Sequence, residues 1–489
     1  MQTIDYISIV GFIVLLVSVG VYGYTRVGSS SDFFTAGGKL PWWLTGVSHH
    51  VSGYSGAVFV AYASIAYTHG FVVYVWWAMT IAIGMLFTVF FIAPRWARLR
   101  EKFGVQSPTE YLATRYGIPA QQLIAWTGVI IKIFDVAAKW AAIGILLNAF
   151  TGLSITAGIA LSGCVTLIYV VLGGVWADVV NDFLSFIIQL ASGIIMMVLV
   201  LRELGDGVGG FFTLWDRLPA ENSQIFREPY TFWFVLAILS INTLTYSGGL
   251  WSLAMRFISS PTGKEAKKAA LLSSALYLIW PLILFFPMFA SPIFFPNLEN
   301  TEKAYSVMAL KFLPPGLLGL MFVSLFSTTL TMTAGDSNTI ASVITRDILP
   351  TINKRVRNFD RKKLLMLARL TTFTFVLFTV ILAFYAESFG GVIGLILSWF
   401  AALTGPISIP MILGLLPWFK HSNGTAVWLS IALGLLTFII MKFCSNVPLA
   451  LEISGPIITS FIVYAGCGLL TKKRVSEKVD HLLDGLNKD

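Results

Sequence analysis

The sequence predicts an all-α, polytopic membrane protein, and three observations lead to that class. The 489-residue chain is 56% hydrophobic and 12% charged, with a mean hydropathy of +0.80, which is far from the composition of a soluble globular chain. Apolar stretches of helix length recur along nearly the whole chain. Lys and Arg gather in alternate connections between these stretches, as they do in the cytoplasmic loops of membrane proteins.

Hydropathy marks about thirteen apolar spans that are long enough to cross a bilayer as helices. They cover approximately residues 6–24, 43–67, 72–93, 121–150, 154–173, 179–202, 230–252, 268–290, 315–345, 366–386, 390–413, 424–442 and 454–471. No basic region precedes the first span, so it is expected to be a retained, peripheral helix without chemistry of its own and not a cleaved signal peptide. The whole chain, 1–489, is predicted to form a single membrane domain.

The distribution of Lys and Arg predicts the orientation in the membrane. The connection 347–365 is rich in both and is expected to be cytoplasmic, whereas the long connection 204–229 is expected to be external. The N-terminus is then outside and the C-terminus in the cytoplasm, in a bacterial-type inner membrane. The net charge of +9 is explained by loops that face anionic lipid headgroups, so no nucleic-acid partner is needed. The oligomeric state is left open.

The three cysteines, Cys164, Cys444 and Cys467, show no metal-binding or disulfide spacing, and they are expected to be inert.

The second span carries polar residues and glycines at mid-membrane depth, in the run GVSHHVSGYSG. We expect its helix to unwind around Gly53 to Gly56, because non-helical backbone inside a membrane is tolerated only where it lines a cavity or a site. His49 and His50, just before these glycines, are either hydrogen-bonded packing residues or ligands of such a site.

Charged residues within two other spans each allow a structural and a functional interpretation. Asp135 and Lys139 lie four residues apart in the fourth span, so Asp135 either forms an intramembrane ion pair or binds the substrate. Asp178, at the start of the sixth span, is explained as a helix cap. Asp182 lies one turn deeper and is harder to explain without a function.

The seventh span, with the run LSINTLTYSGGLW, is a second interrupted polar segment, five spans after the first. This spacing predicts two inverted repeats, residues 43–202 and 230–413, that share a central site, with peripheral segments at 1–42 and 414–489. In the eleventh span, Pro406 and Pro410 are expected to kink a helix that is able to gate the site.

The ninth span contains FSTTLTMTAGDSNTIASVITRD, residues 326–347, which is too polar to face lipid. Thr328 and Thr331 lie on adjacent turns, so a backbone carbonyl and a hydroxyl can converge on one point, as a hard, partly dehydrated cation requires. The alternative is a small-residue helix that packs closely while its Ser and Thr hydroxyls bond to its own carbonyls.

Five segments of the chain, in order and spacing, resemble the sodium:solute symporter family: SSDFFTAGGKLPWWLTGVS, LGGVWADVVND, RFISSPTGKEAKKA, LFSTTLTMTAGDSNTIASVITRDI and GPISIPMILGLLPWFKHSNG. This family includes bacterial proline, pantothenate and sialic-acid transporters and the sodium/glucose cotransporters. The resemblance implies a five-plus-five inverted-repeat core with one extra N-terminal and two extra C-terminal helices. It also implies sodium-coupled import of a small solute by alternating access, without an organic cofactor.

Carried over by position, the resemblance implies a sodium ion bound by the carbonyl oxygens of Val51, Tyr54 and Thr328 and the hydroxyl of Thr331. A second hydroxyl residue usually follows in the family, but this chain has Met332 there. One ligand of the usual set is therefore missing.

A second sodium site that some members possess uses Asp182 and two serines, which are replaced here by Ala334 and Gly335. Asp336 follows them, where an acidic residue is rare in the family. Sodium is thus the expected ion, with Asp182 as a further candidate ligand, and a proton carried by Asp182 or Asp336 is the alternative.

The resemblance also implies a substrate site, formed by Ser52, Ser55, Trp77, Asp135, Asn242 and Trp251. A basic residue that sialic-acid transporters use for the substrate carboxylate aligns with Asp135, so an anionic substrate is disfavoured on Coulomb grounds. The indole faces suit the C–H surface of a sugar or a cation. A neutral sugar or polyol is therefore expected, with an amine or amino acid as the alternative.

Three other classes of protein fit the sequence less well. A transporter-like sensor would be expected to carry a signalling domain, but only a short tail follows Thr471. A channel needs a continuous polar face on several helices, whereas polarity is confined here to mid-membrane breaks. An enzyme is disfavoured because nucleophile, metal-ligand and phosphate-loop spacings are missing from the sequence.

Overall fold

The computed structural model of the protein describes residues 2–26, 29–205, 207–249, 251–389, 392, 395, 401–443, 447–471 and 475–487. Within these ranges the chain is almost entirely helical and has no β-strand, which confirms the predicted fold class. Much of the predicted eleventh span, and Cys444, lie outside the described residues. Cys164 and Cys467 are free thiols.

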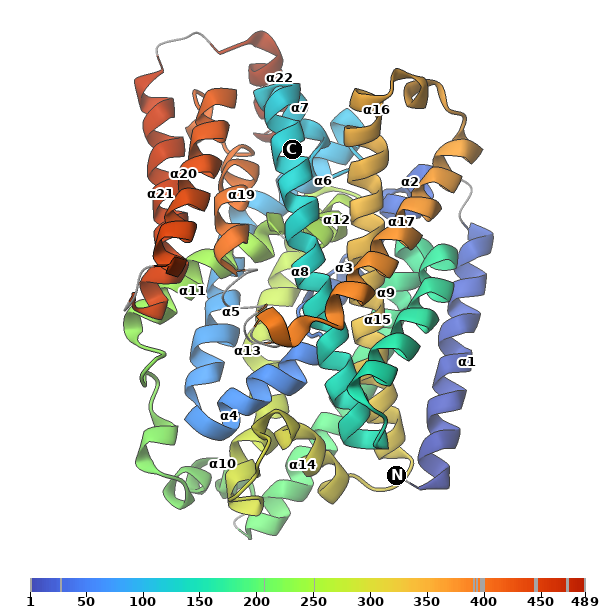
Figure 1. Ribbon diagram of the computed structural model, residues 1–489, viewed down its shortest axis with the longest axis vertical. Helices are drawn as coiled ribbons and strands as arrows, with labels where there is room; N and C mark the ends of the chain where they lie inside the picture. Colours follow the sequence, from blue (N-terminus) through green and yellow to red (C-terminus); the bar gives the residue numbers. More distant parts are fainter. Residues whose placement is uncertain are drawn as a thin grey trace.

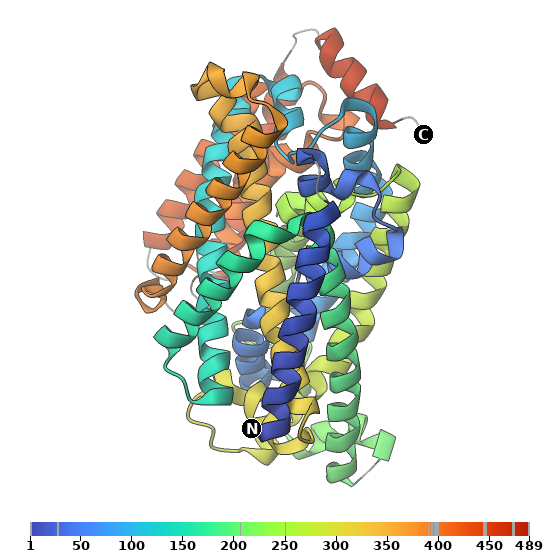
Figure 2. The same cartoon turned by 90° about the vertical axis from the view of Figure 1, so that its right-hand side faces the viewer.

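Long helices follow the long axis of the molecule in both views (Figure 1, Figure 2). The longest are α1 (Thr3–Arg26), α8 (Ile118–Thr151), α9 (Ile155–Leu204), α13 (Gly263–Phe294), α15 (Leu317–Val343), α17 (Arg361–Ala383), α20 (Gly424–Phe443) and α21 (Leu449–Leu470). Shorter helices within the bundle are α3 (Trp42–Val51), α4 (Ala63–His69), α5 (Thr80–Phe87), α11 (Phe232–Leu244), α12 (Trp251–Ile258) and α19 (Ala401–Leu413). Short helices toward the ends are α2 (Ser30–Thr35), α6 (Ala93–Phe103), α7 (Glu110–Tyr116), α10 (Gly210–Thr213), α14 (Ala304–Phe312), α16 (Leu349–Ile352) and α22 (Glu477–Asn487).

Among the described residues, nine helical segments are long and apolar enough to cross a membrane. The thirteen spans and the inverted repeats remain predictions. The predicted fifth and sixth spans are joined in α9, which bends at Gly174. Gly174 has a φ of +59°, a backbone conformation that side chains with a Cβ rarely adopt, so a single glycine takes the place of the expected connection.

Both predicted helix breaks are confirmed. α3 ends at Val51, and residues 52–55 lie outside any helix before the chain continues as a π-helical turn at Val58–Tyr62. The second break lies between α11 and α12, where Gly248 has a φ of +117°. At the first break, a Cβ on Gly53 would lie 1.9 Å from the Tyr277 hydroxyl, so only glycine permits this close approach to α13.

The two ends of the molecule carry different connections. The N-terminus, α10 and α14 lie at one end, and α7, α16 and α22 lie at the other (Figure 1). The connections 204–229 and 347–365 are therefore at opposite ends, in agreement with the predicted topology. Which end faces the cytoplasm remains a prediction.

The first helix contributes a side chain that caps another helix of the bundle. Asp5 is fully buried, and its Oδ1 accepts the amide hydrogens of Gly316 at 2.7 Å and Gly319 at 3.0 Å. These amides lie at the N-terminal end of α15, where they have no acceptor within that helix. α1 thus supplies a capping carboxylate that fixes the start of α15.

Candidate functional site

Helix α15 runs through the protein interior, and most of its hydroxyls bond within the helix. Thr328 Oγ1 donates to the Ser324 carbonyl at 2.8 Å, and Thr333 and Thr339 donate in the same way to carbonyls four residues earlier. The small-residue packing interpretation is therefore correct for much of this helix. Thr331 differs, because its Oγ1 lies 2.6 Å from Asp182 Oδ1 on α9 as well as 3.0 Å from the Thr328 carbonyl.

The first helix break lies against α15. The amide of Gly56 donates to Thr329 Oγ1 at 2.9 Å, next in sequence to Thr328. Within the break, the Tyr54 amide donates to the Val51 carbonyl at 2.8 Å. The four residues predicted as sodium ligands thus come from two adjoining segments, the break after α3 and the middle of α15.

Asp182 lies at the centre of a buried polar cluster beside these segments. Its Oδ2 accepts a hydrogen bond from Ser48 Oγ on α3 at 2.6 Å and lies 3.3 Å from Arg256 Nη2 on α12. The same Arg256 nitrogen lies 2.7 Å from Asp178 Oδ2. Asp178, Asp182 and Arg256, hereafter the acidic triad, are all at most 3% exposed, and with both carboxylates ionised they carry one net negative charge. Asp178 is thus an ion-pair partner, and the prediction of a simple helix cap was wrong.

A second group of buried charges lies between α8 and α15, and we call it the charge ring. Asp135 Oδ2 contacts the ammonium groups of Lys132 at 2.7 Å and Lys139 at 2.9 Å. Asp336 contacts the same two groups, Oδ1 to Lys132 at 2.7 Å and Oδ2 to Lys139 at 2.6 Å. The predicted Asp135–Lys139 ion pair is confirmed. Two partners of this pair were not predicted. Lys132 lies three residues before Asp135 on the same helix, so its spacing could have indicated the contact. Asp336 could not have been predicted in this way, because nothing in the sequence relates α8 to α15.

The residues predicted to bind the substrate fall into separate places. Trp77 packs against Tyr54 at the first break, with ring centroids 5.1 Å apart. Ser52 and Ser55 lie in that break; the Ser52 hydroxyl is buried without a partner among the described residues, whereas Ser55 Oγ accepts from an amide at 3.3 Å. Asn242 instead joins two helices, through a bond to Thr80 Oγ1 at 2.8 Å.

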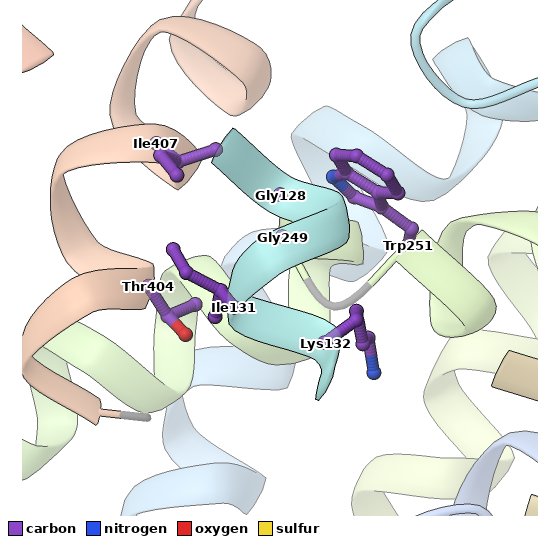
Figure 3. A pocket seen from close by; sticks show the side chains of 7 residues that line it. All are labelled: Gly128, Ile131, Lys132, Gly249, Trp251, Thr404 and Ile407. Atoms are coloured by element: carbon purple, nitrogen blue, oxygen red, sulfur yellow. The ribbon is translucent and has the colours of Figure 1, made fainter. Parts of the chain in front are cut away.

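Trp251 lies elsewhere, at the start of α12 and close to the charge ring. Its indole packs on Gly128, where an added Cβ would lie 2.0 Å from the ring. Trp251 and Lys132 line a cavity of about 20 Å³ together with Thr404 of α19 (Figure 3). This volume suits about one water molecule, so a solute of sugar size would require these helices to move apart.

The two adjacent histidines have different surroundings. His49 is fully bonded: Nδ1 lies 2.9 Å from Ser273 Oγ and Nε2 lies 3.2 Å from the Tyr246 carbonyl, which fits the packing interpretation. His50 is buried among aromatic rings, with its centroid 4.5 Å from that of Tyr277. Neither ring nitrogen of His50 has a hydrogen-bond partner among the described residues.

Two interrupted helices, a polar helix inside an apolar bundle and buried charges near mid-span define a class of protein, the membrane transporters with a central site. The chain belongs to the sodium:solute symporter family, whose model matches residues 33–432. It is 21% identical to the sodium/sialic acid symporter NanT of Aliivibrio fischeri, over 98% of this chain and 96% of that protein. It is 23% identical to the sodium/glucose cotransporter of Vibrio parahaemolyticus, over 71% of this chain and 68% of that protein.

The fold is also that of a solved transporter. The substrate-bound, outward-open structure of a Na⁺-coupled sialic acid symporter superimposes with a TM-score of 0.83 at 19% identity, covering 96% of this chain and 98% of that one. As a member of the sodium:solute symporter family, the chain is a membrane transporter and not an enzyme.

Proposed function

We propose that this protein is a sodium-coupled symporter that imports a small neutral polar solute, and that Val51, Tyr54, Thr328 and Thr331 bind the ion. The contact between Thr331 and Asp182 is the observation that carries the proposal. A threonine hydroxyl has a single proton, and at 2.6 Å from a carboxylate it donates that proton to Asp182. The hydroxyl lone pairs are then available to a cation, beside the carbonyl of Thr328.

Asp182 has two roles in this proposal. It orients the Thr331 hydroxyl, and its negative charge offsets the cost of moving a cation from water into a buried site. Asp182 is therefore a positioning residue that acts through Thr331, and it need not touch the ion. This role makes up for the missing hydroxyl at Met332, because charge replaces a neutral ligand.

Proton coupling has less support. Asp336, one of the two candidate proton carriers, contacts two ammonium groups, and such neighbours favour its charged form. Asp182 is the remaining candidate. It accepts two hydroxyl hydrogens and contacts a guanidinium, partners that stabilise a carboxylate, whereas its complete burial acts against the charge. Asp182 is therefore the group through which a proton would couple, and the protonophore arm of the uptake assay tests it directly.

A neutral solute fits the electrostatics of the core. The Coulomb argument against an anion, drawn from Asp135 alone, does not hold, since Lys132 and Lys139 compensate its charge. For the same reason Asp135 gives no support to a cationic amine. What favours a sugar or polyol is the first break, where the Trp77 indole lies beside the hydroxyls of Ser52 and Tyr54, which have no hydrogen-bond partner among the described residues.

Uptake into proteoliposomes tests this function. Labelled sugars, polyols, amines, amino acids and sialic acid are offered with an inward sodium gradient, with potassium in place of sodium, and with a pH gradient and a protonophore. Sodium-dependent uptake of a sugar or polyol is the expected result. Uptake that persists without sodium and collapses with the protonophore would replace sodium by a proton, and the absence of uptake of every class would favour a sensor.

A matched pair of variants tests the ion site. Thr331→Val keeps the side-chain shape but removes the hydroxyl, so the sodium concentration for half-maximal uptake is expected to rise. Thr339→Val is the control, because among the described residues the Thr339 hydroxyl bonds only to the Gly335 carbonyl of its own helix, at 2.7 Å. Equal sodium dependence in the two variants would remove Thr331 from the site.

A further inference from the structure

We infer that the buried charges fix the number of coupled ions at one monovalent cation per solute. This inference rests on the proposed function for the identity of the ion, but the count follows from the charge ring and the acidic triad. Both groups contact α15 at consecutive residues. Asp336 belongs to the charge ring, and Gly335 faces the acidic triad, where an added Cβ would lie 2.9 Å from Asp178 Oδ2.

The charge ring has no capacity for a further cation. It contains two lysines and two aspartates, and each carboxylate contacts both ammonium groups at 2.6–2.9 Å. All four side chains are at most 9% exposed, so water does little to screen them. The lysines thus act as permanently attached cations, and Asp135 and Asp336 are already neutralised.

The acidic triad, in contrast, is short of one positive charge. Arg256 contacts both Asp178 and Asp182, which leaves one negative charge in a fully buried place. An uncompensated charge inside a protein is costly, and a bound cation removes that cost. The Thr331 hydroxyl connects this charge to the proposed ion ligands.

The other buried charges lie away from this region and have partners of their own. Among the described residues they are Asp5 at the start of α15, Asp347 beyond its end and Arg115 of α7. Asp347 accepts hydroxyl hydrogens from Ser107 and Thr109, each at 2.6 Å, and Arg115 donates to backbone carbonyls. Residues 390–400 of the eleventh span, of which the structure describes only 392 and 395, contain no charged residue in their sequence.

One monovalent cation therefore brings the core to neutrality. A second cation would leave a net positive charge near Asp178. Arg256 also lies on this side of α15, where a Cβ added to Gly335 would be 3.3 Å from the Arg256 Nη2 atom. The guanidinium thus excludes a second ion both by its charge and by the space it takes.

Sodium binding to the purified full-length protein tests the count without knowledge of the solute. Radioactive sodium is titrated at constant ionic strength, and the ions bound per chain are counted at saturation. The expected result is one ion per chain with a non-cooperative binding curve. Two ions per chain would overturn this inference and leave the proposed function standing. No bound sodium would overturn both, because the ion itself would then be wrong.

Variants of the charge ring test the reasoning behind the count. Lys132→Gln leaves one carboxylate of the charge ring uncompensated, so this variant is expected to bind a second cation, either sodium or a proton. Binding of the second cation is measured as additional bound sodium or as proton uptake. The double variant Lys132→Gln with Asp135→Asn is neutral again and is expected to bind one ion. Lys132→Arg is the control that keeps the charge. Folding of the Lys132→Gln protein is judged by its elution as a monodisperse species. If the folded variant binds the same number of ions per chain as the wild type, the charge argument is refuted. If the variant does not fold, the number of ions bound by the wild type decides the inference.

Discussion

Two substitutions that change the charge of the acidic triad equally, Asp178→Asn and Asp182→Asn, separate the two roles proposed for Asp182. Each removes the net negative charge that favours a bound cation. Only Asp182→Asn also removes the carboxylate that orients Thr331, whose hydroxyl lies 2.6 Å away. The difference between the variants therefore measures the orienting hydrogen bond, with the change in charge held constant.

The size of that difference follows from the geometry. A hydrogen bond to a charged group is worth about 1.5–3 kcal/mol. Converted to an equilibrium constant, this is about ten- to hundredfold. We expect the half-saturating sodium concentration of Asp182→Asn to exceed that of Asp178→Asn by this factor, and both to exceed that of the wild type.

The assay is the sodium dependence of uptake, supported by sodium binding to the purified variants. Arg256 has lost one of its two carboxylate contacts in either variant. The control Asp178→Glu, which keeps the charge, shows how far the geometry of the ion pair alone matters. Equal shifts in the two asparagine variants, or a larger one for Asp178→Asn, would refute the orienting role of Asp182.

Three further predictions concern other parts of the molecule. Asp135→Asn leaves the charge ring with excess positive charge and is expected to lower the free energy of unfolding by about 3–5 kcal/mol, because one partner of a buried pair is lost. Adding Lys139→Gln is expected to restore neutrality and function, as measured by thermal stability and uptake. Failure of the double variant to recover would assign Asp135 a further role. The topology is tested with single cysteines at Asn358 and Ser223, both exposed positions, in a protein whose native cysteines are replaced. An impermeant thiol reagent applied to intact cells should label only the cysteine at position 223. Labelling of position 358 alone would invert the predicted topology. Asp5→Ala should destabilise the protein by about 1–2 kcal/mol through loss of the α15 cap, with sodium affinity unchanged, and a shift in that affinity would show that α1 also influences the site.

The predictable part of the structure depends on local chemistry. Glycines and hydroxyl residues inside an apolar span cannot face lipid or form an ordinary membrane helix, so both breaks, after Val51 and near Gly248, could be located from the sequence. The same reasoning found the polar helix α15. It did not find the bend in α9 at Gly174, because a single glycine at a kink within one helix has the same sequence signature as a short connection between two helices.

The tail after Thr471, for which no secondary structure was predicted, contains an ordered helix. It contains the helix α22, with Val479, Leu482, Leu483 and Leu486 buried, and Arg98 of α6 donates to the Leu486 carbonyl at 2.6 Å. An amphipathic segment of this length is stable only when a partner surface covers its apolar face, so its order depends on α6 and α7 and not on its own residues.

The sequence by itself determined that charges and hydroxyls would gather inside the membrane, because such residues are too costly there without a reason. Only the tertiary structure decided their partners. Lys132 meets Asp336 across 204 positions, and Thr331 meets Asp182 across 149. Local spacing could suggest the pair Asp135–Lys139, since the two residues lie one helical turn apart. Contacts between different helices depend instead on how α8, α9 and α15 pack, and no property of a single segment encodes that packing.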